Sequence, residues 1–124
     1  MRFLSPEWLT AAATLVKDVE AGTLPAVTVV QRVTGGPTGD VIYQMVIDGS
    51  VSLVIGDTSD PDAVILTESW DTAAAINTAR LTPHEAVLSG LLVVTGDRFV
   101  ISELAPVFAS IANALSELRP ATTF

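Results

Sequence analysis

The sequence predicts an α+β fold, a five-stranded and mostly antiparallel sheet with helices layered on one face. Three observations predict it. A capped helical segment comes first, three strand-like runs joined by turn residues follow it, and a helical segment with an apolar stripe comes late in the chain. A chain of 124 residues has the length of one domain, so we expect residues 1–124 to form a single unit.

Composition excludes several classes of protein. Apolar residues make up 49% of the chain and charged residues 16%, which is too apolar for a disordered chain. The net charge of −8 repels phosphate backbones and anionic membranes, so no nucleic-acid partner is expected. No apolar run approaches the roughly 20 residues of a membrane helix, and no secretory signal is visible, so we expect no stable membrane insertion and a cytoplasmic location.

The first helix is expected to begin at Ser5-Pro6-Glu7. This triplet offers a capping hydroxyl, a proline where no N–H donor is needed, and a carboxylate at the positive helix end. Apolar residues then recur at helical spacing as far as Gly22, a typical residue just beyond a helix end. They are Trp8, Ala12, Leu15 and Val19.

Three strands are predicted next, at Ala26 to Val33, Val41 to Ile47 and Val51 to Ile55. Asp48-Gly49 between the last two is typical of a type I′ hairpin, so the strands should form an antiparallel meander. Alternation places Tyr43, Met45, Leu53 and Ile55 on one face, and Ile42, Val46 and Val54 on the other. The second apolar set reflects either β-propensity or a partner subunit, which makes a homodimer possible.

The remaining elements follow an acidic loop at residues 57–62. A fourth strand is predicted at Ala63 to Thr67, and a fifth at Leu91 to Thr95. Between them Ser69 caps one helix, and Thr82-Pro83-His84-Glu85 is a capping box that begins another. A last helix is predicted from Ser102, with Pro120 ending it.

No residue pattern points to catalysis, to a cofactor or to a metal. Gly35 to Gly39 lacks the phosphate-binding pattern, Asp57, Asp60 and Asp62 lack EF-hand spacing, and His84 has no serine in a nucleophile elbow. Glu68 and Asp71 flank Trp70, and a carboxylate beside an indole can acquire a raised pKa. Charge–dipole stabilisation of a helix start is the simpler interpretation of that pair.

In its order of elements the chain resembles the sterol carrier protein type 2 family. The resemblance covers nearly the whole chain, and its most specific part is a glycine, an alternating strand and a Gly-Asp pair. The stretches that carry it are Phe3-Leu4-Ser5-Pro6-Glu7-Trp8, Asp48-Gly49, Leu66-Thr67-Glu68-Ser69 and Gly90-Leu91-Leu92-Val93-Val94-Thr95-Gly96-Asp97. The resemblance implies an apolar cavity between one sheet face and the helices, with the last helix as a movable lid.

The function that this resemblance implies is non-catalytic binding of a fatty acyl or polycyclic lipid, or another apolar small molecule, in an internal tunnel for transfer or presentation. No enzyme activity is expected. The candidate ligand-binding residues are Tyr43, Met45, Leu53, Ile55, Trp70, Ile76, Leu88, Phe99, Leu104, Phe108, Ile111 and Leu115. Two alternatives stay open, namely a dimerisation or accessory module with a vestigial pocket, and a small cone-type isomerase or dehydratase.

Overall fold

A computed structural model describes residues 1–124, and its centre is one five-stranded mixed sheet with the strand order β3-β2-β1-β4-β5. Only β1 and β4 run parallel, and the other neighbouring strands are antiparallel. The predicted α+β class and the mostly antiparallel sheet are thereby confirmed. The strands are β1 (Val27–Gly36), β2 (Gly39–Asp48), β3 (Ser50–Ile55), β4 (Val64–Ser69) and β5 (Leu92–Thr95).

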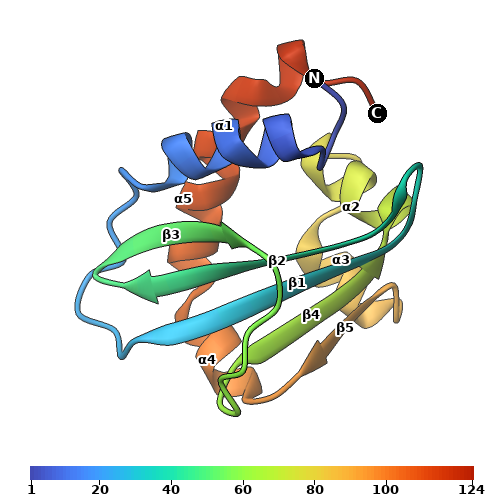
Figure 1. Ribbon diagram of the computed structural model, residues 1–124. Coiled ribbons are helices and arrows are strands. Elements are labelled where there is room, and N and C mark those ends of the chain that lie inside the picture. Colours follow the sequence, from blue (N-terminus) through green and yellow to red (C-terminus); the bar gives the residue numbers. More distant parts are fainter.

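The helices gather on one side of this sheet, with α5 passing behind the strands and α1 lying over β3 (Figure 1). Their bounds are α1 (Pro6–Val16), α2 (Trp70–Asn77), α3 (Pro83–Leu88), α4 (Arg98–Glu103) and α5 (Ala105–Leu115), followed by the 3₁₀ helix η1 (Ser116–Ala121). No helix combines the length and the apolar character needed to cross a membrane.

Helix α1 begins as predicted but ends six residues before Gly22. Ser5 accepts a hydrogen bond from the Trp8 N–H, and Pro6 occupies the first turn. After Val16 the chain turns, because Glu20 and Ala21 pair with the hairpin beside them instead of continuing the helix. The Ala21 N–H donates to the Gly49 carbonyl at 3.0 Å.

The two hairpins of the meander are tighter than predicted. Strands β1 and β2 continue through the glycines to Gly36 and Gly39, so that only Pro37 and Thr38 remain in the turn. In the second hairpin Asp48 pairs with Ser50, and only Gly49 has a positive φ, of 71°. A type I′ turn needs positive φ at two residues, so that prediction is wrong.

The N-caps predicted before α2 and α3 are confirmed, but the capping box at Thr82 forms only in part, because the Glu85 carboxylate accepts from the Thr82 hydroxyl at 3.0 Å instead of from its backbone N–H. Ser69 accepts from the Thr72 N–H and Thr82 accepts from the Glu85 N–H, each at 3.1 Å. These interactions are local, which is why the sequence predicts them well. Strand β4 is longer than predicted, since it continues to Ser69 and so includes Glu68.

The C-terminal helical segment starts earlier than Ser102 and has a break. Asp97 accepts from the Phe99 N–H and starts α4, which ends at Glu103 with Leu104 as its C-cap. Pro106 then lies in the first turn of α5, where a missing N–H donor costs nothing. Pro120 does not end α5, which stops at Leu115, but lies inside η1.

The two chain ends lie side by side (Figure 1). The Phe3 N–H donates to the Thr123 carbonyl at 2.9 Å, and the Thr123 N–H donates to the Met1 carbonyl at 2.7 Å. Trp8 adds a side-chain bond from its indole N–H to the Thr122 hydroxyl at 3.1 Å. The N-terminal segment, α1 and the residues after η1 therefore form one packed unit.

Candidate functional site

Nine of the predicted ligand residues come together between the sheet and the helices. Five are buried in the hydrophobic core, namely Tyr43, Met45, Leu104, Ile111 and Leu115. Four more are partly buried and pack against that core, namely Leu53, Trp70, Ile76 and Phe108. The strand residues among them share the face that the helices cover, because the register aligns Tyr43 with Ile55 and Met45 with Leu53. This surface is called the core face below.

The other three predicted residues are not brought into this cluster. Ile55 lies at the end of edge strand β3 and is 56% exposed, Leu88 ends α3 and is 74% exposed, and Phe99 on α4 is 82% exposed. Spacing alone did not separate these residues from the buried ones. Their role in ligand binding stays a prediction.

Two pockets adjoin this cluster, and neither is an internal tunnel. The first has a volume of about 480 Å³ and lies between the N-terminal segment, the β1–β2 turn and Trp70. The second, of about 420 Å³, lies between the start of β1, the acidic loop and α4, and includes Leu104. Of the predicted ligand residues, only Trp70 lines the first pocket and only Leu104 lines the second.

Trp70 separates the first pocket from the core. Its indole lines the pocket, packs against the core, and lies edge-on to Phe3 with ring centroids 5.9 Å apart. Gly36 closes over the same ring. A Cβ at this position would lie 3.1 Å from Trp70 Cδ1 and 2.7 Å from the Gly39 carbonyl oxygen, so the hairpin approaches this closely only because Gly36 has no side chain.

Three polar side chains interrupt the otherwise apolar core face. The register aligns Gln31 of β1 with Tyr43 of β2 and with Leu66 of β4, and it aligns Glu68 with Val33. Alternation therefore directs Gln31, Tyr43 and Glu68 to the same side. We call these three residues the polar band. Neither Gln31 nor Glu68 was predicted at this site, although each breaks an apolar alternation, after Val29 and after Leu66 respectively.

The environment of the polar band shifts two pKa values. Burial raises the pKa of the Glu68 carboxyl to about 7. Burial, and secondly the charge of Glu68, raise the pKa of Tyr43 above its ordinary value. Glu68 Oε2 is buried without a hydrogen-bond partner, and so is Trp70 Nε1. Glu68 lies in β4 and not in α2, whereas Asp71 lies in the first turn of α2, as the helix-start interpretation expects. The pKa of Glu68 is raised by its burial.

This shift predicts a pH-dependent stability that Glu68→Gln should remove. The folded-state pKa of about 7 exceeds the ordinary 4.5, so the folded protein holds the proton more tightly. The contribution to stability is complete below pH 4.5 and is lost as the pH rises toward 7. Between about pH 4.5 and about pH 8, the advantage of the variant should grow by about 2 kcal/mol, discounted for partial solvent access.

Urea unfolding of both proteins across this pH range measures that difference. Asp71→Asn is the matched control, since this carboxylate is exposed and lies three residues away. The control should follow the wild-type profile, and parallel profiles for wild type and Glu68→Gln would contradict the burial of the charge.

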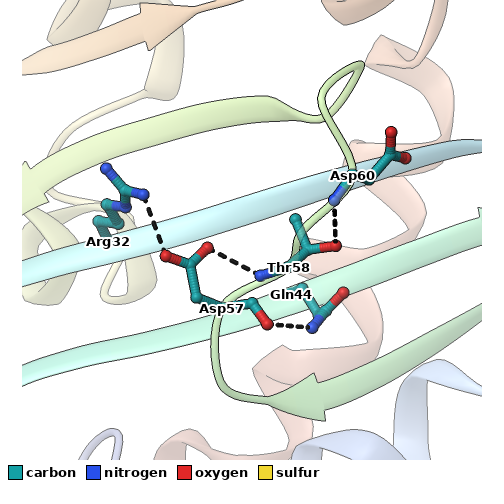
Figure 2. A network of polar contacts seen from close by, with 5 residues as sticks. All are labelled: Arg32, Gln44, Asp57, Thr58 and Asp60. Carbon is teal, nitrogen blue, oxygen red and sulfur yellow. Dashed lines mark hydrogen bonds and ion pairs between the residues drawn. The ribbon is translucent and has the colours of Figure 1, made fainter.

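The opposite face of the sheet carries the second predicted apolar set, and the loop from β3 to β4 crosses part of it (Figure 1). Asp57 holds this loop through an ion pair with Arg32 at 3.1 Å and through its carbonyl, which accepts from Gln44 at 3.1 Å (Figure 2). Val30 is completely buried on this face. Val54 remains 47% exposed, whereas Ile42 and Val46 are partly buried. The homodimer stays a prediction.

Asp57 and Asp60 also accept hydrogen bonds from backbone N–H groups within the loop. Asp57 Oδ1 accepts from the Thr58 N–H at 2.8 Å, and Asp60 Oδ1 accepts from the Asp62 N–H at 2.9 Å. The hydrogen bond from Thr58 is the main cause that lowers the pKa of Asp57, and Arg32 lowers it further (Figure 2). His84 lies exposed in the first turn of α3.

Comparison with solved structures relates this arrangement to known proteins. No protein-family model and no curated protein matches the chain. A crystal structure of sterol carrier protein 2 superposes with a TM-score of 0.74 and 17% identity, covering 94% of this chain and 98% of the other. A protein of Thermus thermophilus, described as possibly a sterol carrier protein, gives 0.73 and 17%, covering 95% and 90%.

Two further neighbours come from Aedes aegypti and are described with a fatty acid. Sterol carrier protein 2 in complex with palmitate gives a TM-score of 0.59 and 28% identity, covering 89% of this chain and 98% of the other. A palmitated sterol carrier protein 2-like protein gives 0.66 and 20%, covering 83% and 93%. In fold, the chain is therefore a sterol carrier protein 2-like domain.

Proposed function

We propose that the chain binds a lipid or another apolar small molecule between the core face of the sheet and the helices, and transfers or presents it without catalysis. The observation that carries the proposal is the shared fold with two structures that are described with palmitate. In this chain the layer between the core face and the helices holds most of the predicted ligand residues, which come from β2, β3, α2, α5 and, in Leu104, the junction of α4 and α5.

The route to this layer is proposed to run through the first pocket. Trp70 is the predicted ligand residue that contacts both this pocket and the core, so rotation of its indole would open a path from the pocket into the core. A pocket of about 480 Å³ is within the usual range for small-molecule sites. The bound molecule would be held mainly by buried apolar area, at about 25 cal/mol per Å², so its volume and shape would matter most.

The proposal predicts saturable binding of long-chain acyl compounds in the micromolar range. Displacement of a fluorescent fatty acid by palmitate and by a sterol measures it, with circular dichroism to verify that the protein is folded. Val54→Lys is a suitable control, because Val54 lies on the opposite face and is 47% exposed. Its affinity should match that of the wild type. A folded protein that binds no member of a panel of acyl and polycyclic ligands would overturn the proposal.

The proposal includes a cytoplasmic location and the absence of a cofactor. The predicted homodimer does not depend on ligand binding, since it would use the sheet face opposite the core face.

A further inference from the structure

The polar band is unusual because it crosses the core face of the three central strands, where apolar residues otherwise pack. Glu68 Oε2 and Trp70 Nε1 are both buried without a partner, and their residues flank Ser69 at the junction of β4 and α2. A buried polar atom without a partner costs free energy, typically about 1–3 kcal/mol. Such atoms in a native structure need an explanation, and a polar group of a ligand is one.

The two orphaned atoms need opposite partners. In its ionised form the Glu68 carboxylate only accepts hydrogen bonds, whereas the indole N–H of Trp70 only donates. The carboxylate of a fatty acid would leave Glu68 without a donor, and an ammonium group would leave Trp70 without an acceptor. A hydroxyl group donates one hydrogen bond and accepts others, so it is the one of these three head groups that suits either atom.

The charges around Glu68 also disfavour an anionic ligand. Tyr43 of β2 is the titratable group that faces it, and it bears no positive charge. Arg32 of β1 lies on the opposite sheet face and pairs with Asp57. Other charged or titratable residues lie at the near ends of the elements around Glu68, and all of them are exposed. They are Asp40 of β2, Asp71 of α2, and His84 and Glu85 of α3. Strand β5 has no charged or titratable residue. Arg2 and Glu7 of the N-terminal segment line the first pocket beside Trp70 and are exposed. The core face of the sheet itself carries no cation that would neutralise an anionic ligand at the polar band.

We propose that the polar band receives the hydroxyl group of an alcohol-headed lipid and that Glu68 selects against ligands with an anionic head. The inference rests on the proposed function, which supplies the apolar site for the rest of the ligand. It makes Glu68 a specificity-determining residue, which weakens the binding of fatty acids relative to alcohols of the same chain length without abolishing it.

The test compares dodecanol with dodecanesulfonate, which share an alkyl chain. The sulfonate stays anionic at all the pH values used. A change with pH in the ratio of the two affinities must therefore come from a group of the protein that gains or loses a proton. At about pH 8.5, where Glu68 is ionised, dodecanol should bind at least about tenfold more tightly, because about 1.4 kcal/mol of repulsion gives tenfold in affinity. At about pH 5.5 this ratio should fall at least about fivefold as Glu68 takes up its proton.

Glu68→Gln should give a low ratio that does not change with pH. Asp71→Asn, which removes an exposed carboxylate of the same junction, should retain the wild-type ratio and its pH dependence. Trp70→Phe, which removes the N–H donor and part of the ring, should weaken the binding of dodecanol, whose hydroxyl oxygen loses this donor.

The other outcomes would overturn either the selectivity alone or both proposals. Equal affinities for the two probes, or a pH-dependent ratio that survives in Glu68→Gln, would overturn the selectivity and leave the proposed function intact. The same holds if the fluorescent fatty acid binds while neither probe displaces it. If neither the probes nor the fluorescent fatty acid binds to the folded protein, both proposals fail together.

Discussion

Trp8→Ala is expected to destabilise the protein by about 3–5 kcal/mol, the usual cost of deleting a large buried aromatic side chain. Trp8 is 2% exposed and is among the largest fully buried side chains. Its ring meets Phe3 edge-on, with centroids 5.1 Å apart and planes at 85°, and its N–H donates to Thr122. The substitution therefore removes core packing and the link between α1 and the C-terminal residues at once.

Urea unfolding of matched variants divides this effect into its parts. Thr122→Val removes the hydrogen bond but keeps the ring, and should cost about 1 kcal/mol. Trp8→Phe keeps an aromatic ring of smaller volume and should fall between the two. A loss below about 1 kcal/mol for Trp8→Ala would show that the N-terminal segment is not packed on the core in solution.

Ile111→Asp is expected to unfold the domain or to cost at least about 4 kcal/mol, because it places an unpaired charge in the core. Ile111 is 4% exposed and belongs to the hydrophobic core. Phe108, three residues earlier on α5, is only partly buried against that core. Phe108→Asp should therefore retain most of the secondary structure while abolishing ligand binding, as expected where α5 covers the proposed site.

Circular dichroism together with the fluorescent fatty acid titration distinguishes these effects. Ser110→Asp is the control, since it introduces the same charge on an exposed position of α5. It should leave both the fold and the affinity nearly unchanged. A well-folded Ile111→Asp variant with wild-type affinity would contradict both the core position of Ile111 and the proposed place of the ligand.

The elements that could be predicted from the sequence are those that depend on neighbouring residues. Ser5, Ser69 and Thr82 cap helices through bonds to N–H groups three residues away. Alternation likewise placed Tyr43 and Met45 on the face opposite Ile42 and Val46. Helix ends were less predictable, because α1 stops where distant hairpin residues pair with Glu20 and Ala21.

The candidate site could be predicted only in part, because some of its contacts join residues that are distant in the sequence. Its apolar residues follow from helical and strand spacing. The polar band depends on the parallel pairing of β1 with β4, which join parts of the chain more than 30 residues apart. No local pattern gives that register. The exposure of Leu88 and Phe99 also depends on how short helices α3 and α4 sit against the rest of the molecule.

The paired chain ends make this domain suitable for circular permutation. Because Met1 and Phe3 already hydrogen-bond to Thr123, a short flexible linker would join the ends without moving either. New ends could be opened between Gly22 and Thr23, which are both exposed. The chain would then begin with β1 and finish with α1, while every strand kept its neighbours. The order of elements along the chain, on which the resemblance rests, could thus be changed while the spatial arrangement that forms the site is kept.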